Sequence, residues 1–141
     1  MLQNLALGLF IVCLTVLVHV FGLIWTTRAM NWMVKRFRLH GGSLLAMVTV
    51  VIGLFIILLV QTSVWAICYE FVDAFPNFST SMYFSVASFA TLGLGDVIPA
   101  HGWRLLGAIE SLNGFLMIGW STAYLVSASI RLGPFRSGEH F

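Results

Sequence analysis

Charged residues are scarce in this sequence: only 9% of its 141 residues are Asp, Glu, Lys or Arg, whereas 60% are hydrophobic. Soluble domains carry about 25% charged residues, so this composition excludes an ordinary soluble protein and indicates an integral membrane protein. The formal net charge of +2 is too small to suggest a nucleic-acid partner.

Cysteine is almost absent, with two copies, and no motif for catalysis is present. Cys13 and Cys68 lie inside apolar runs without a CxxC or Cys/His spacing, so we expect both to pack and neither to bind a metal or form a disulfide. The sequence lacks a Ser/His/Asp set, a metal-ligand cluster and a phosphate-binding loop. We therefore expect no enzymatic activity and no cofactor apart from bound ions.

Three long apolar segments are present instead, each exceeding the length of about 20 residues that a membrane-spanning helix needs. They run from about Leu5 to Thr27, from about Ser43 to Tyr69 and from about Trp103 to Ile130. The first segment is not typical of a signal peptide, because it is too long and lacks a basic n-region and a cleavage pattern. We expect it to stay in the mature protein.

A fourth apolar segment, from Ser79 to Ala90, lies between the second and third spans. It is only about a dozen residues long, which is too short to cross a bilayer but long enough for a re-entrant helix. Ser79 is expected to cap this helix behind Pro76 and Asn77.

The basic residues orient these segments in the membrane. They follow the first and third spans, and the positive-inside rule places both regions in the cytoplasm. Of the seven basic residues only Arg104 departs from this rule; the other six are Arg28, Lys35, Arg36, Arg38, Arg131 and Arg136. The N-terminus is then outside, the C-terminus is cytoplasmic, and the short segment enters from the outer side and returns to it. We expect a multi-pass protein of a bacterial inner membrane.

The six residues from Thr91 to Asp96, with the sequence TLGLGD, interrupt the apolar pattern. Irregular backbone at membrane depth is tolerated only where it is buried in protein or lines a water-filled path. Gly93 and Gly95 allow successive carbonyls to point inward and replace the hydration shell of a cation. One copy cannot encircle an ion, so this hypothesis requires a homotetramer. Asp96 would then place a ring of carboxylates at the outer mouth.

The pattern Ser88-x-x-Thr91-x-Gly93-Leu94-Gly95-Asp96 resembles the signature of potassium-channel pore domains, usually Thr-x-x-Thr-x-Gly-Tyr-Gly-Asp. The resemblance covers roughly residues 79–127, because the short apolar segment, Pro99 and the start of the long helix at Arg104 follow in the family's order. It implies a potassium-selective channel whose filter binds dehydrated K⁺. The implied ligands are the carbonyls of Thr91, Leu92, Gly93 and Leu94 and the Thr91 hydroxyl, with Gly95 at the turn out of the filter.

The resemblance also implies the fold and the division of the chain. We expect an all-α membrane protein with three transmembrane helices, a re-entrant pore helix and an extended selectivity filter, assembled as a homotetramer. Residues 1–42 would form an extra N-terminal helix and a basic linker, and residues 132–141 a short cytoplasmic tail. The pore domain would cover 43–131, with the outer helix at 43–69, the pore helix at 79–90, the filter at 91–96 and the inner helix at 103–130.

Departures from the signature affect the support of the filter. Leu94 stands where Tyr is usual, so the ring that normally braces the filter against pore-helix aromatics, here Tyr83 and Phe84, is missing. Ser88 and Ala90 replace the usual threonines. Two alternatives to strict K⁺ selectivity are therefore kept: a weakly selective monovalent cation channel, or a pore-loop subunit of a cation uptake system.

The third span carries two features of an inner helix. The resemblance places Gly114 at the position where such helices bend, whereas Gly107 and Gly119 are expected to allow close helix packing. A stripe at helical spacing is expected to line a water-filled cavity below the filter, or alternatively to face lipid or a neighbouring helix. Its members are Ser111, Phe115, Ile118 and Thr122, of which Phe115 and Ile118 are candidates for a hydrophobic constriction.

Two ionisable side chains lie within the spans, where an unpaired charge is costly. We expect Glu110 to support the pore helix by accepting hydrogen bonds from Ser or Thr side chains, with pH sensing as the alternative. We expect His19 to be hydrogen-bonded to a neighbouring helix, again with proton sensing as the alternative.

The connection between the first two spans, from Arg28 to His40, interleaves aromatic and basic residues as an interfacial helix on an anionic leaflet does. Its basic residues are candidates for binding anionic lipid, with topological anchoring as the alternative: Arg28, Lys35, Arg36 and Arg38. We expect neither a voltage sensor, since no helix carries regularly spaced basic residues, nor a cytoplasmic ligand-binding domain.

Overall fold

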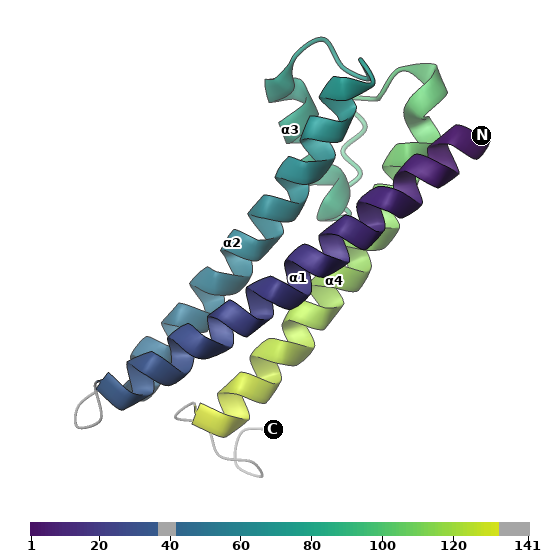
Figure 1. Ribbon diagram of the computed structural model, residues 1–141. Helices are drawn as coiled ribbons and strands as arrows, with labels where there is room; N and C mark the ends of the chain where they lie inside the picture. Colours follow the sequence, from purple (N-terminus) through teal and green to yellow (C-terminus); the bar gives the residue numbers. More distant parts are fainter. Residues whose placement is uncertain (37–41, 133–141) are drawn as a thin grey trace.

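The computed structural model describes residues 1–36 and 42–132, and all regular structure in this part of the chain is helical. Three long helices lie side by side, and a short fourth helix packs beside two of them at one end of the bundle (Figure 1). The elements are α1 (Leu2–Arg36), α2 (Gly42–Phe71), α3 (Phe78–Phe89), the 3-10 turn η1 (His101–Trp103) and α4 (Arg104–Leu132). The expectation of an all-helical chain is confirmed for the described residues.

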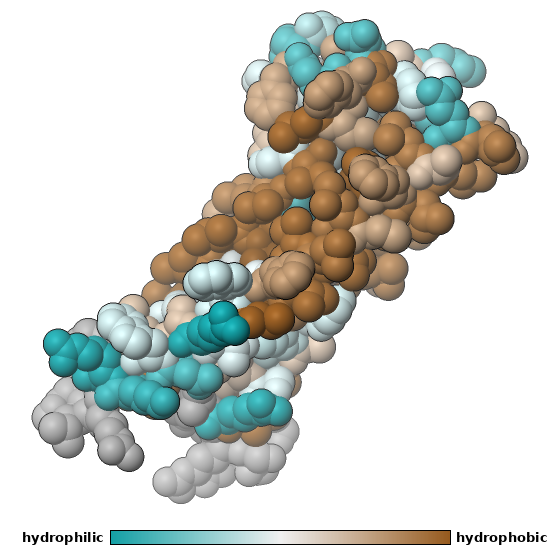
Figure 2. Space-filling model, viewed as in Figure 1, coloured by the Kyte–Doolittle hydropathy of each residue, from teal (hydrophilic) through white to brown (hydrophobic). Residues whose placement is uncertain are grey.

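Helices α1 and α2 have the length and the apolar composition of membrane-spanning helices. Their most apolar 18-residue windows have mean hydropathies of 2.7 and 3.0, and only 28% and 22% of these windows is buried within the chain. The remaining apolar surface faces outward, as the broad hydrophobic band between two more polar ends shows (Figure 2). Helix α4 is 29 residues long but more polar, with Glu110 and Asn113 in the half that packs beside α3.

Helix α3 is short and does not run the length of the bundle. Its 12 residues rise about 18 Å, less than the roughly 30 Å of a bilayer's hydrocarbon core. It starts at the end of the bundle that holds the N-terminus, and residues 90–100 return the chain to that same end (Figure 1). The chain therefore makes a short excursion along α2 and α4 before α4 begins.

Asn77 caps the start of α3. Its side-chain oxygen accepts hydrogen bonds from the backbone nitrogen and the hydroxyl of Thr80, both at 2.9 Å. The expectation that Ser79 caps this helix is wrong, because the helix already begins at Phe78 and Ser79 lies inside its first turn. A backbone hydrogen bond of 3.0 Å from Ala100 to Ala74 ties the connection that enters α3 to the one that leaves it.

Helix α1 is longer than the predicted first span. It continues unbroken to Arg36, so residues 28–36 extend the helix and do not form a separate interfacial one. Met30 packs in the core between α1 and α2, and this stretch contains no glycine or proline to end the helix. Arg38 lies outside the described residues.

Close packing joins α1 to α2. A methyl group added at Gly22 would come within 2.4 Å of Ile57, and one added at Gly53 would come within 2.6 Å of Thr26. The two glycines therefore let the helices approach more closely than larger residues would. Both cysteines are free, but only Cys68 is buried, so the expectation of packing fails within this chain for the exposed Cys13.

The core has two parts along the bundle. Beside α3 it is built around Trp65, Tyr69 and Leu106, all fully buried. Toward the other end it is built from smaller aliphatic side chains, among them Val50 and Leu54. The large side chains thus gather where the short helix and the returning loop must be held in place.

Candidate functional site

The predicted filter segment, Thr91 to Asp96, lies between the end of α3 and the start of α4. All six residues are exposed in the single chain. A cavity of about 310 Å³ separates the segment from α3 and α4. Its lining includes Phe84 and Ser88 of α3, Gly107 of α4 and Leu94 of the segment itself.

The backbone dihedral angle φ alternates in sign along this segment. Thr91, Gly93 and Gly95 have φ of +58°, +60° and +75°, whereas Leu92 and Leu94 do not lie in the left-handed region. A side chain added at either glycine would meet no atom within 4 Å, so glycine is required there by its φ and not by space. Alternation in the sign of φ turns successive peptide planes so that their carbonyls can project toward the same side. This is the arrangement that a row of carbonyl ligands needs.

Thr91 belongs both to this segment and to the end of α3. The helix ends in a Schellman motif: Leu92 N donates to Ala87 O, and Thr91 N donates to Ser88 O, both at 2.9 Å. Thr91 occupies the position of this motif that must be left-handed, and this position is usually glycine. A β-branched residue held there costs about 1–3 kcal/mol, and such strain concentrates at functional sites.

Asp96 holds the far end of the segment against α3. Its carboxylate accepts a hydrogen bond of 2.7 Å from the hydroxyl of Tyr83 and one of 3.0 Å from the backbone nitrogen of Val97. Leu94 itself is 59% exposed and makes no such link. A tyrosine of α3 therefore ties down the segment, in place of one within it.

Serine hydroxyls connect α3 to α4 behind the segment. The hydroxyls of Ser88 and Ser111 lie 2.9 Å apart, and each lies 3.2 Å from the carbonyl oxygen of Gly107. Gly107 in turn lies against Phe84, since a methyl group added to it would come within 3.0 Å of that ring. The prediction of close packing at Gly107 is confirmed.

Glu110 is fully buried between α2, α3 and α4. Its carboxylate oxygens lie 2.5 Å from the Ser85 hydroxyl and 2.6 Å from the Tyr69 hydroxyl, and Ser85 also lies 2.8 Å from the carbonyl oxygen of Thr62. The expected contact of Glu110 with a serine of the short helix is present. Phe84 and Phe75 pack on the Tyr69 ring, with centroids 5.4 Å away in both cases.

Two glycines of α4 differ in their surroundings. A methyl group on Gly114 would lie 2.0 Å from the carbonyl oxygen of Phe89, so this position requires glycine for the approach of α3. A methyl group on Gly119 would meet nothing within 4 Å, so the expectation of close packing at Gly119 fails within the described chain.

The four residues of α4 that were predicted to line a cavity differ in exposure: Phe115 is 68% exposed, Thr122 is exposed, and Ser111 and Ile118 are half-buried.

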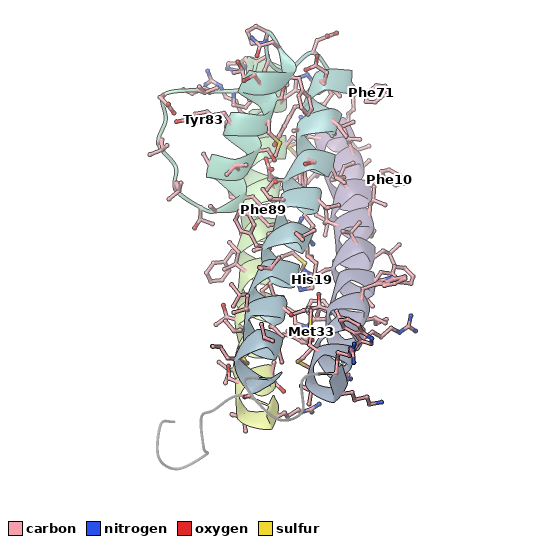
Figure 3. The ribbon with its side chains drawn as sticks, turned by 90° about the vertical axis from the view of Figure 1, so that its left-hand side faces the viewer. Phe10, His19, Met33, Phe71, Tyr83 and Phe89 are labelled. Carbon is pink, nitrogen blue, oxygen red and sulfur yellow. The ribbon has the colours of Figure 1, made fainter. Side chains whose placement is uncertain are left out.

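The predicted lipid-binding residues and His19 lie on α1. Arg28, Lys35 and Arg36 are exposed, and the Arg28 guanidinium lies 5.7 Å from the centre of the Trp25 ring. His19 is fully buried and lies between α1 and α2 (Figure 3). Its Nδ1 lies 3.4 Å from the amide nitrogen of Gln61. The expected contact of His19 with a neighbouring helix is therefore present.

Sequence reasoning missed several buried partners. Tyr69 and Ser85 were not identified as the partners of Glu110, and Thr15 and Asn113 were not identified as hydrogen-bonded to each other. A usable signal exists for part of this set, because Glu110 and Asn113 lie one turn apart on an otherwise apolar face. Polar residues spaced in this way on a membrane helix are expected to face a partner helix.

Comparison with known proteins assigns the family. A family model described as "Ion channel" matches residues 52–131, which is more than half of the chain. The chain belongs to this ion-channel family. The matched region runs from α2 to the end of α4 and contains α3 and the whole predicted filter segment.

Two curated proteins are similar over part of this region. "Potassium channel subfamily K member 7" of Mus musculus is 36% identical over 55 residues, which cover 39% of this chain and 18% of that protein. "Uncharacterized membrane protein YdjJ" of Bacillus subtilis (strain 168) is 39% identical over 62 residues, which cover 43% of this chain and 18% of that protein. The chain thus matches less than a fifth of the length of each relative. No solved structure matches.

Proposed function

We propose that four copies of this chain form a potassium-selective channel, with the carbonyls of Thr91 to Leu94 as ligands for dehydrated K⁺. The observation that carries the proposal is the alternating backbone of this segment, with φ of +58°, +60° and +75° at every second residue. This geometry supports a row of carbonyls facing one side, and four such rows around an axis would surround an ion. Bound K⁺ would then be the only non-protein component.

In this assembly α1, α2 and α4 cross the membrane and α3 is a re-entrant pore helix. The 29 residues of α4 rise about 43 Å, enough to span, and the predicted pore lining lowers its need for apolar residues. The C-terminal end of α3 would point toward the membrane centre, where its partial negative charge favours a cation. Thr91 would add a hydroxyl at the inner end of the filter, and Asp96 a carboxylate ring at the outer mouth.

The inner half of the pore would be formed by α4. Phe115 is 68% exposed in the single chain, which supports a position on the pore axis or against a second copy. Together with Ile118 it would form a hydrophobic constriction below the filter, and Ser111 and Thr122 would line the cavity around it. Gly114 would be the point at which α4 bends.

The orientation follows from charge. Arg28, Lys35 and Arg36 would lie at the cytoplasmic surface of a bacterial inner membrane, with the N-terminus outside. The exposed basic side chains, with Arg28 beside Trp25, support contact with anionic lipid headgroups.

Reconstitution tests the function directly. Purified protein in liposomes with a K⁺ gradient should carry K⁺ current, and the reversal potential should follow the K⁺ gradient and not the Na⁺ gradient. Chemical cross-linking of the reconstituted protein should stop at tetramers. Absence of flux, a reversal potential indifferent to K⁺, or cross-linking that stops at dimers or trimers would each contradict the proposal.

A weakly selective cation channel is the second candidate, and the cavity beside Leu94 favours it. The cavity of about 310 Å³ behind the segment leaves Leu94 without the ring that would hold the filter at one width. Leu94→Tyr should fill part of this cavity and lower the permeability of Na⁺ relative to K⁺ by about threefold or more, the equivalent of about one new hydrogen bond. A permeability ratio that is unchanged in Leu94→Tyr would discard the missing ring as a cause of weak selectivity.

A further inference from the structure

A buried polar cluster joins α1 to the other two long helices. It consists of Thr15 and His19 on α1, Gln61 on α2 and Asn113 on α4. The exposed fraction is 0% for the first three and 2% for Asn113. The cluster lies outside the predicted filter and includes residues of α1, a helix without an assigned role in the proposed channel.

Thr15 is the centre of this cluster. Its carbonyl oxygen accepts a hydrogen bond of 2.9 Å from the side-chain nitrogen of Gln61, and its hydroxyl accepts one of 2.9 Å from the side-chain nitrogen of Asn113. One turn further along α1, His19 lies 3.4 Å from the same Gln61 nitrogen, and its ring centre lies 4.9 Å from that of Trp120. Within residues 113–120, helix α1 therefore contacts α4 at two places.

These two places lie on either side of the glycines of α4. Asn113 and Trp120 are seven residues apart, which is two helical turns, and Gly114 and Gly119 lie between them. Glycines are the points at which a helix bends most readily. Helix α1 thus holds the stretch of α4 in which bending costs least.

The same stretch touches the end of α3. Gly114 directly follows Asn113, and a methyl group placed on it would lie 2.0 Å from the carbonyl oxygen of Phe89, the last residue of α3. Thr91 follows two residues later. A bend of α4 at Gly114 would therefore move a contact of the helix that carries the predicted filter.

Stability alone does not account for this cluster. The polar atoms His19 Nε2, Gln61 Oε1 and Asn113 Oδ1 are buried and have no hydrogen-bond partner among the described residues. Unpaired polar atoms in a buried site are costly, and apolar side chains of similar shape would fill it without that cost. In some proteins, buried polar groups of this kind fix how one element sits against another.

We propose that α1 restrains the bending of α4: Thr15 and His19 hold α4 on both sides of Gly114 and Gly119 and thereby set how often the channel opens. The proposal rests on the channel function inferred above for the opening step. Its structural part, the restraint of residues 113–120 by α1, does not. Thr15, His19 and Asn113 act as positioning residues, since none lies in the ion path.

Single-channel recording tests the effect on opening. Thr15→Val and Asn113→Leu keep the shape of each side chain but remove the hydrogen bond between them. Each should change the open probability by about threefold to thirtyfold, the range that one hydrogen bond inside a membrane protein supplies, and the double variant should change it no further. Unitary conductance and reversal potential should stay unchanged, because the filter is not touched. Thr15→Ser, which keeps the hydroxyl, should behave as the unmodified protein does.

A control of the same chemistry is available on α2. The Thr49 hydroxyl is exposed and donates to the carbonyl of Leu45 in its own helix, so Thr49→Val should leave the open probability unchanged. Open probabilities that are unaltered in Thr15→Val and Asn113→Leu, or effects that add fully in the double variant, would overturn the proposed restraint of α4 by α1.

Amide hydrogen exchange tests the restraint without requiring current. Exchange of the α4 amides at residues 114–119 should be several-fold faster in Thr15→Val than in Thr49→Val. Equal exchange in the two variants would overturn the proposal even if the channel conducts. An unmodified protein that carries no K⁺ current would instead refute the channel function, while the exchange result would still decide whether α1 restrains α4.

Discussion

The two ends of the bundle are held together by different interactions. Around α3 the contacts are directional: Glu110 lies between Ser85 and Tyr69, and Asp96 accepts from Tyr83. Toward the other end α1 and α2 meet mainly through aliphatic packing, and the Thr27 hydroxyl of α1 lies 2.8 Å from the Tyr124 hydroxyl of α4. Hydrogen bonds fix the position of a group within a few tenths of an ångström, whereas aliphatic packing tolerates exchange of shape. The chain uses the precise interactions at the end that holds the proposed filter.

The largest expected effect separates Gly93, which has a positive φ, from Gly119, which is helical. Gly93→Ala places a side chain on a residue with φ of +60°, which costs about 1–2 kcal/mol in every copy of the chain. It should abolish K⁺ selectivity or all current in the liposome assay. Gly119→Ala is the matched control for selectivity, because neither added methyl group meets an atom within 4 Å and Gly119 lies in α4, outside the predicted filter. Selective K⁺ current through the Gly93→Ala protein would contradict the filter assignment.

Removal of the Glu110 carboxylate should have the next largest effect. Glu110→Leu leaves the hydroxyls of Tyr69 and Ser85 buried without this acceptor, which should lower the free energy of unfolding by about 2–4 kcal/mol. Thermal unfolding in detergent measures the loss. Thr27→Val at the other end removes a half-buried hydroxyl contact and should cost about 1 kcal/mol. Similar losses in the two variants would remove the distinction between the ends.

Overpacking at the aliphatic end should affect stability without affecting selectivity. Gly22→Ala puts a methyl group 2.4 Å from Ile57, so α1 and α2 must separate slightly, at a cost of about 1–3 kcal/mol. The ratio of K⁺ to Na⁺ permeability, measured from reversal potentials, should stay the same. A changed ratio would show that the filter depends on packing at both ends.

The smallest expected effect concerns the hydroxyl that replaces the missing filter tyrosine. Tyr83→Phe removes the hydrogen bond of 2.7 Å to Asp96 on an exposed surface, which contributes about 1 kcal/mol or less. The permeability ratio for K⁺ over Na⁺ should fall by at most about fivefold, with the oligomer intact by size-exclusion chromatography. If the ratio stays constant, Asp96 does not depend on Tyr83 for its position.

The helices were predictable from the sequence because each follows an apolar run of suitable length. The end of α1 was not, since the basic residues near Arg36 change the polarity of the chain without breaking a helix. The cap of α3 was misplaced because Ser79 and Asn77 are both good capping residues, and only the fold decides at which of them the helix begins. Local chemistry therefore predicts elements better than it predicts their ends.

The partners of the buried polar groups were beyond sequence reasoning. Glu110 was expected to accept from a serine or threonine, yet nothing in the sequence singles out Ser85, which lies 25 residues away, or adds Tyr69. Asn113 and Thr15 are separated by 98 residues, and their contact exists only because α4 packs alongside α1. Long-range pairs of this kind depend on helix packing, which the spacing of apolar residues does not specify.

The position of Thr91 in the cap of α3 links the folding of that helix end to the binding of an ion in the proposed channel. Its backbone nitrogen completes the last turn of the helix, and in the proposed channel its carbonyl and hydroxyl would bind the innermost ion. Such linkage is reciprocal. An ion that stabilises this conformation of Thr91 also stabilises the end of α3, and fraying of that end lowers the affinity for the ion. The K⁺ concentration would then act on the protein as a ligand does, and the channel should unfold at a higher temperature in K⁺ than in an ion that the filter rejects.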